Sequence, residues 1–129
     1  MKIEHGAIWV RDLEAMKLYY EDFFEAKAGP KYHNPSKEFS SYFLYFESGG
    51  PRLELMHRPD IAGIGGRDTA SIGLAHQAFS VGAAEKVCSL TQRIGLAKGM
   101  VLQEPRIKGD GYYESVVLDP EGNHLEITV

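Results

Sequence analysis

The sequence has few of the features that mark secreted, membrane or nucleic-acid-binding proteins. Cys88 is the only cysteine, so no disulfide can form within the chain and we expect a reducing, cytoplasmic compartment. The 14 Lys and Arg are dispersed and outnumbered by 18 Asp and Glu, which argues against nucleic acid or a membrane surface as partner. No apolar run approaches the ~18 residues of a membrane-spanning helix, and the N-terminus lacks the apolar core of a signal peptide.

A repeated pattern stands out in what the sequence does contain. His-x-Ala-apolar-x-Val occurs once from His5 and again from His76. Towards the end of each half, "LYFESGGPRLEL" (44–55) lies over "VVLDPEGNHLEI" (116–127), which aligns Glu54 with Glu126. The same order of features twice in 129 residues indicates a duplicated module within one domain. We predict a single domain of residues 1–129, with module one at 1–57, a linker at 58–72 and module two at 73–129.

Each half predicts a strand, a helix and then further strands, which is an α+β plan. In the first half, residues 3–10 form a β-prone run, Asp12 is placed to cap a helix, and Gly29-Pro30 is expected to end that helix. A hairpin follows, with its turn at 48–51. In the second half the expected elements are a strand at 73–81, a helix near 83–95 with Val87, Leu90 and Ile94 on one stripe, and strands near 100–104, 112–118 and 123–129.

The alternation of side chains along the strands singles out two histidines and two glutamates. In the first strand His5, Ala7 and Trp9 share a face, while Ile8 and Val10 point the other way towards the helix. The same rule places His76, Glu54 and Glu126 on the corresponding faces of their own strands. We therefore expect the four side chains to converge between the modules.

Two imidazole nitrogens and two carboxylates, without a thiolate, suit a divalent ion of intermediate hardness. Ni²⁺, Co²⁺ and Zn²⁺ are the leading candidates, and Fe²⁺ and Mn²⁺ remain chemically reasonable. A structural role for a single strand histidine is common, but the duplicated frames of His5, Glu54, His76 and Glu126 favour metal ligation. An unpaired buried carboxylate would be costly in any other setting.

Residues around this quartet are candidates for a substrate pocket. Trp9 and Met56 share faces with the ligands and would form an apolar wall, as would Tyr112 or Tyr113, for which ordinary packing is an equal alternative. Arg52 or Arg58 would meet a carboxylate or phosphate of the substrate, although Arg58 also fits a solvated loop.

At these residues the chain resembles the vicinal oxygen chelate superfamily, the glyoxalase/bleomycin resistance/dioxygenase group. "DPEGNHLEI" is similar to the closing motif of that group and "GLAHQAFSV" to the opening strand of its second module. The resemblance implies paired βαβββ modules that form a half-open barrel around a metal site. It also implies a homodimer, in which sites can form within one chain or between subunits.

The four predicted ligands are similar to the set that marks glyoxalase I, whereas dioxygenase and thiol transferase members generally need only three. Three substrate contacts of glyoxalase I differ here. Its two arginines correspond to Trp9 and Ile72, and its asparagine corresponds to Arg58. These departures argue against a glutathione adduct as the substrate.

The resemblance therefore implies a metal-dependent lyase or isomerase, in which the metal chelates two adjacent substrate oxygens and acidifies a neighbouring C–H. Glu126, or its counterpart Glu54, would move the proton between adjacent carbons, and we favour Glu126. The alternatives are another metal enzyme of the group, namely a dioxygenase or a thiol transferase, and a small-molecule-binding protein without turnover.

Overall fold

A computed structural model describes residues 1–61, 73–109 and 111–129 of the chain. The described residues belong to two units, Met1–Ile64 and Gly65–Val129. The mixed α+β class is confirmed, with one helix and one open sheet in each unit. The predicted linker at 58–72 lies mostly outside the described residues.

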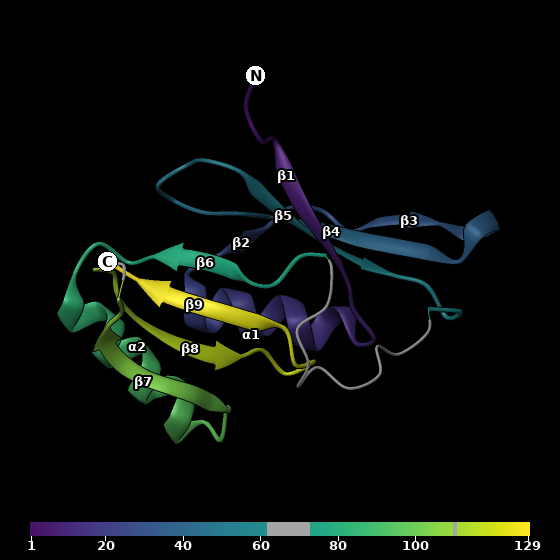
Figure 1. Ribbon diagram of the computed structural model, residues 1–129. Helices are drawn as coiled ribbons and strands as arrows, with labels where there is room; N and C mark the ends of the chain where they lie inside the picture. Colours follow the sequence, from purple (N-terminus) through teal and green to yellow (C-terminus); the bar gives the residue numbers. More distant parts are fainter. Residues whose placement is uncertain (62–72, 110) are drawn as a thin grey trace. The chain divides into compact units, whose positions relative to one another are not determined.

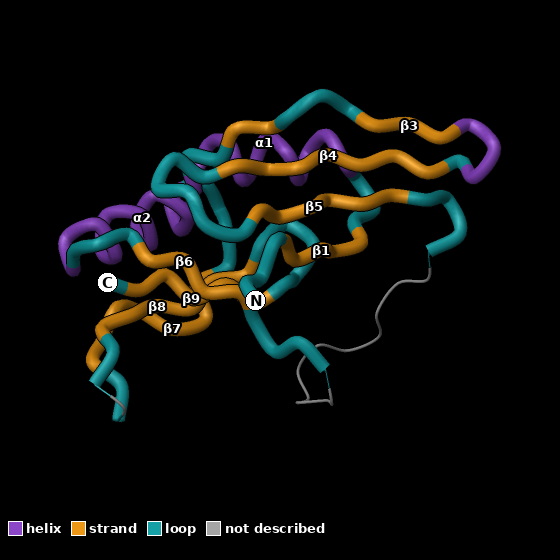
Figure 2. Tube along the Cα trace, turned by 90° about the horizontal axis from the view of Figure 1, so that it is seen from above, coloured by secondary structure: helices purple, strands orange, loops and turns teal. Residues whose placement is uncertain are grey.

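The first unit is built from β1 (His5–Trp9), α1 (Leu13–Phe24), β2 (Lys27–Ala28), β3 (Tyr32–Asn34), a 3-10 turn (Pro35–Lys37), β4 (Phe39–Tyr45) and β5 (Arg52–His57). Its strand order is β1-β5-β4-β2, and β3 also pairs with β4. Figure 2 labels β1, β5, β4 and β3 side by side in this order. Strand β1 is parallel to β5, and the other pairs are antiparallel. The expected hairpin of β4 and β5 is confirmed.

The second unit is built from β6 (Gln77–Ser80), α2 (Ala84–Leu96), β7 (Val101–Ile107), β8 (Tyr113–Leu118) and β9 (His124–Thr128). Its strand order is β6-β9-β8-β7, which can be followed in Figure 1. Strand β6 is parallel to β9, as β1 is to β5.

The two units therefore share one βαβββ plan, in which β2 and β3 together correspond to β7. The correspondence extends to the register, because Ala7 lies opposite Glu54 in the first unit and Ala78 lies opposite Glu126 in the second. These are the positions that the repeat in the sequence aligns. The expected half-open barrel concerns the arrangement of the two modules, and it stays a prediction.

Helix α1 begins as its sequence predicts but ends earlier. The Asp12 side chain accepts a hydrogen bond from the backbone N–H of Ala15 at 2.9 Å. The expectation that Gly29-Pro30 ends the helix is wrong, because the helix already stops at Phe24. Glu25 adopts a left-handed conformation with φ 54°, and its N–H bonds the carbonyl of Tyr20. A non-glycine residue in this conformation gives little signal in the sequence.

One face of each sheet packs against the helix of its own unit. In the first unit the buried apolar residues of this face are Val10, which directly follows β1, and Leu44, Leu53 and Leu55 of the strands; in the second they are Val117, Leu125 and Ile127. The helices contribute buried stripes at helical spacing, namely Leu13, Met16, Tyr20 and Phe24 in α1, and the predicted Val87, Leu90 and Ile94 in α2. Burying each large apolar side chain contributes about 1.5–3 kcal/mol to the free energy of folding, so this face of each sheet is held against its helix. The opposite face is available to polar side chains.

The two strands that carry the histidine pattern are shorter than predicted. Strand β1 begins at His5, which pairs with Arg52, the first residue of β5. Strand β6 begins at Gln77, which pairs with Leu125 near the start of β9. Residues 3–4 lie before the first pair of the β1–β5 ladder and residues 73–76 before the first pair of the β6–β9 ladder, so both segments stay outside the strands. His76 therefore precedes β6 instead of lying within it.

Candidate metal centre

In the first unit, His5 and Glu54 face each other from neighbouring parallel strands. The imidazole Nε2 of His5 lies 3.9 Å from the Oε2 of Glu54. The His5 side chain is 38% exposed and that of Glu54 is 15% exposed, so the carboxylate lies deeper than the ring. Phe43, which pairs with Glu54 on β4, presents its ring at 5.2 Å from the imidazole in an edge-to-face arrangement. The sheet thus brings together one predicted pair of ligands.

The other ring nitrogen of His5 is held by its neighbour in the chain. Glu4 accepts a contact from His5 Nδ1 through one carboxylate oxygen, and its second oxygen pairs with Arg52. The hydrogen bond to His5, assisted by Arg52, lowers the pKa of the Glu4 carboxyl below its ordinary value of 4.5. A carboxylate on Nδ1 fixes the ring orientation and leaves Nε2 to face Glu54, as in many histidine metal ligands.

In the second unit, His76 and Glu126 form the equivalent pair. His76 Nε2 lies 3.2 Å from Glu126 Oε2, with side chains 44% and 14% exposed. The other oxygen of Glu126, Oε1, accepts a hydrogen bond from the Lys108 ammonium at 3.1 Å. Lys108 also contacts the buried Glu114. These two carboxylates, Glu114 first, raise the pKa of Lys108 above its ordinary value of 10.5 and keep it charged.

The donor set fits a divalent transition metal. Each pair offers one imidazole nitrogen and one carboxylate oxygen, which are ligands that suit ions of intermediate hardness. An ion about 2.1 Å from each donor holds two adjacent ligands roughly 3.0–3.4 Å apart. The 3.2 Å of the second pair falls in this range, while the 3.9 Å of the first would have to shorten.

Among residues 1–61, 73–109 and 111–129, no group of three or more His, Cys, Asp or Glu is placed to hold a metal ion. Each unit by itself supplies one pair of the predicted quartet. The joining of the two pairs in one site stays a prediction.

Three predicted pocket residues of the first unit lie further along β1 and β5 or directly after β5. Trp9 and Met56 pair with each other between β1 and β5, and Met56 lies on the same face of β5 as Glu54. Trp9 is 45% exposed and contacts Phe39 edge to face. The Arg58 guanidinium lies 5.2 Å from the centroid of the Trp9 ring, and its Nε is 3.0 Å from Asp60.

The two predicted pocket tyrosines of the second unit differ in their surroundings. Tyr112 is 58% exposed and precedes β8. The hydroxyl of Tyr113 hydrogen-bonds Cys88 of α2 at 3.1 Å, and that contact raises the pKa of Tyr113. Tyr113 therefore reaches towards the helix, on the face opposite to Glu126. Ile72, where glyoxalase I has an arginine, lies outside the described residues.

Two residues that contact the candidate pairs, Glu4 and Lys108, were not predicted from the sequence. Strict alternation would send Glu4 away from the face of His5, but Glu4 precedes the strand and is free to turn towards it. Lys108 lies in the connection between β7 and β8, and its spacing from Glu126 carries no periodic signal. The sequence indicates only that Lys108 lies in a turn, because it follows a strand and precedes Gly109.

The family description "Glyoxalase/Bleomycin resistance protein/Dioxygenase superfamily" matches residues 2–127 of the chain. The chain belongs to this superfamily. The match spans both modules, and the resemblance of "GLAHQAFSV" and "DPEGNHLEI" is confirmed at this level. No curated protein matches the chain significantly.

Solved structures of the superfamily share the fold. Glyoxalase I from Zea mays is 25% identical with a TM-score of 0.75, and the match covers 98% of this chain and 44% of that one. The chain thus spans less than half the length of the maize enzyme. The trypanothione-dependent glyoxalase I of Leishmania major is 20% identical (TM-score 0.77, 99% and 86% covered). A glyoxalase family protein from Enterococcus faecalis is 23% identical (TM-score 0.79, 99% and 97% covered).

The description of the superfamily names glyoxalases, bleomycin resistance proteins and dioxygenases, so membership leaves the activity open. Superfamily members typically bind a divalent metal, which agrees with the donor set described above. In the part of the chain that the structure describes, neither helix has the length and apolar character required to cross a membrane.

Proposed function

We propose that the chain is a metal-dependent lyase or isomerase of the glyoxalase I type, which moves a proton between adjacent carbons of a small chelating substrate. The observation that carries the proposal is the equivalence of the two pairs. In each unit a histidine Nε2 faces the oxygen of a glutamate on the neighbouring parallel strand. A binding protein without a metal has no need for two such pairs.

In this proposal His5, Glu54, His76 and Glu126 hold one divalent ion, with Ni²⁺, Co²⁺ and Zn²⁺ as the leading candidates. When bound, such an ion supplies Lewis acidity to two adjacent substrate oxygens. Glu4 keeps the His5 ring in the orientation that presents Nε2. Trp9 and Met56 offer apolar surface on the same sheet face, and this surface would exclude water from the reacting carbons.

The proton transfer is assigned to Glu126, with Glu54 as the alternative. Lys108 donates a hydrogen bond to Oε1 of Glu126, which fixes the orientation of the carboxylate while Oε2 takes and returns a proton. For Glu54, the side chain described at its oxygens among the residues of the structure is the His5 ring, without a lysine or arginine beside it. This difference between the two pairs breaks their pseudo-symmetry and supports Glu126 as the base.

The substrate is proposed to be something other than a glutathione adduct. Trp9 and Arg58 stand where glyoxalase I has an arginine and an asparagine that contact glutathione, and Arg58 is already paired with Asp60. The homodimer expected from the resemblance stays a prediction that light scattering would test.

The proposal is tested by following solvent deuterium. Protein loaded with Ni²⁺ or Co²⁺ is incubated in D₂O with hemithioacetals of methylglyoxal, formed with glutathione and with smaller thiols, and the products are followed by proton NMR. We expect metal-dependent isomerisation with deuterium at the carbon next to the carbonyl, and its loss in Glu126→Gln. Fe²⁺-dependent oxygen uptake without exchange would instead identify a dioxygenase.

A further inference from the structure

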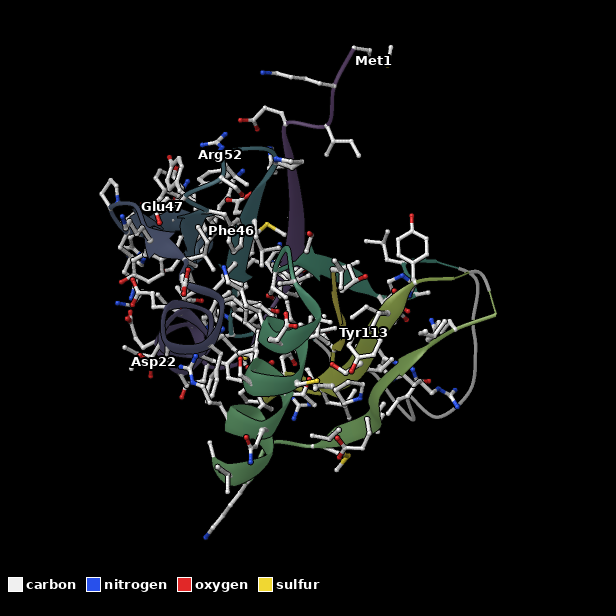
Figure 3. The ribbon with its side chains drawn as sticks, turned by 90° about the vertical axis from the view of Figure 1, so that its left-hand side faces the viewer. Met1, Asp22, Phe46, Glu47, Arg52 and Tyr113 are labelled. Atoms are coloured by element: carbon white, nitrogen blue, oxygen red, sulfur yellow. The ribbon has the colours of Figure 1, made fainter. Side chains whose placement is uncertain are left out.

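A groove of about 590 Å³ opens at one end of the first unit's sheet. It is lined by residues 2–4, by Tyr45 at the end of β4, and by residues 50–52 at the start of β5. Figure 3 shows Arg52 at this end of the sheet, from which the N-terminal segment extends to Met1. The volume lies in the range typical of small-molecule sites, ~300–1,000 Å³.

Arg52 is the organising cation of the groove, and its guanidinium is held before any ligand arrives. Its Cζ lies 4.1 Å from the centroid of the Phe43 ring and 5.6 Å from that of Tyr45. Its Nη1 donates a hydrogen bond to the Tyr45 hydroxyl at 3.3 Å. The side chain is 27% exposed, so the guanidinium is partly shielded but remains accessible from the groove. A stacked arginine fixed in this way loses little entropy on binding an anion.

The structure also contains an example of the anion that this arginine accepts. One oxygen of the Glu4 carboxylate pairs with Nη2 of Arg52. Glu4 is 55% exposed, and an ion pair of that exposure contributes little to stability. A carboxylate from a ligand can therefore replace Glu4 at Arg52 at small cost, while the second oxygen of Glu4 remains on His5.

The position of Arg52 connects the groove to the candidate metal centre. Arg52 lies opposite His5 in the ladder, and it precedes Glu54 by two residues on the same face of β5. Two residues of a strand span ~6.6 Å. A carboxylate on Arg52 thus lies only a few bonds from any group bound between His5 and Glu54.

We propose that Arg52 is a substrate-binding residue, and that the substrate carries a carboxylate a few bonds away from its chelating oxygens. This inference rests on the proposed function for the identity of those oxygens. The groove favours a carboxylate over a phosphate, because the group that Arg52 already holds is a planar monoanion.

The test compares two ligands of equal length. 2-Oxoglutarate and 2-oxovalerate both offer two vicinal oxygens, but only the first carries a distal carboxylate. Their binding to Ni²⁺-loaded protein is measured by isothermal titration calorimetry for the wild type, for Arg52→Ala and for Arg93→Ala. The last variant removes an arginine from α2 and controls for net charge.

We expect the wild type and Arg93→Ala to prefer 2-oxoglutarate by about tenfold or more, as charged hydrogen bonds typically allow. Arg52→Ala should bind both ligands equally, with unchanged affinity for 2-oxovalerate. Glu4→Gln, which removes the competing charge but keeps an acceptor for His5, should strengthen binding of 2-oxoglutarate. Equal binding of the two ligands by the wild type, or loss of the preference in Arg58→Ala instead of Arg52→Ala, would overturn the assignment.

A titration of metal-free protein separates this inference from the proposed function. Glutarate, which has no vicinal oxygens, is added while backbone amide signals are recorded by NMR. We expect shifts at Arg52 and Tyr45 that are absent in Arg52→Ala, whether or not the protein takes up a metal. Failure to bind Ni²⁺ together with these shifts would contradict the proposed function alone. Absence of the shifts in a protein that binds Ni²⁺ would contradict the carboxylate site alone.

Discussion

Replacement of Lys108 by Met is the perturbation whose cost can be worked out most directly from the structure. The side chain of Glu114 is only 5% exposed, and its carboxylate contacts the Lys108 ammonium. Lys108 also donates to Glu126 at 3.1 Å. Met keeps most of the side-chain volume, so the change removes the charge with little loss of packing.

Removing one partner of a buried ion pair costs about 3–5 kcal/mol, because the other charge is left buried and unpaired. Lys108 is 31% exposed, so water can replace part of its contact with Glu114. We therefore expect Lys108→Met to lower the free energy of unfolding by about 2 kcal/mol, below the range for a fully buried pair.

The assay is urea unfolding at pH 7, followed by circular dichroism. Adding Glu114→Gln to Lys108→Met should restore part of the loss, since the buried charge is then gone, and this double mutant isolates the coupling. Lys86→Met, on the exposed face of α2, serves as the control and should change stability by less than ~0.5 kcal/mol. A Lys108→Met loss no larger than this control, or the absence of rescue by Glu114→Gln, would refute the reasoning.

The remaining predictions concern the core, the pH dependence and the catalytic base. Leu55→Ala, at a fully buried position of β5, should lower the free energy of unfolding by about 2–5 kcal/mol in the same urea assay. The hydrogen bond from Lys31 lowers the pKa of Glu14 below 4.5 and raises that of Lys31 above 10.5. The difference in melting temperature between the wild type and Lys31→Met should therefore be largest at pH values between these two pKa values, and it should fall towards both acid and alkaline pH. An equal difference at pH 3 and pH 7 would contradict this expectation. Glu126→Gln should abolish turnover while retaining some metal, as measured by activity and elemental analysis, and unchanged turnover would rule out Glu126 as the base.

The sequence predicts the fold well where side-chain periodicity decides the outcome. The stripe of Val87, Leu90 and Ile94 and the cap at Asp12 are both confirmed. Strand ends are less predictable, because they depend on a partner far along the chain. His76 is outside β6 since the ladder with β9 begins only at Gln77.

The sequence singles out the histidine and glutamate of each candidate pair, but not the residues that contact these pairs. The pairing of His5 with Glu54 follows from alternation along β1 and β5, whereas that of His76 with Glu126 follows from the repeat, because His76 precedes β6. The contacts of Glu4 and Lys108 depend on segments outside the strands, where no period constrains the direction of a side chain. Tyr113 was predicted to line the pocket, but its hydroxyl hydrogen-bonds Cys88 on α2, on the face opposite to Glu126.

The metal content of the protein tests the central claim most directly. Elemental mass spectrometry is applied to untagged protein purified without chelators, beside the His5→Ala/His76→Ala double mutant. The account predicts about one Ni²⁺, Co²⁺ or Zn²⁺ per site in the wild type and its loss in the double mutant. A wild type that contains no metal, and takes up none of these ions nor Mn²⁺ or Fe²⁺ on titration, would contradict the account and favour a binding protein on the same fold.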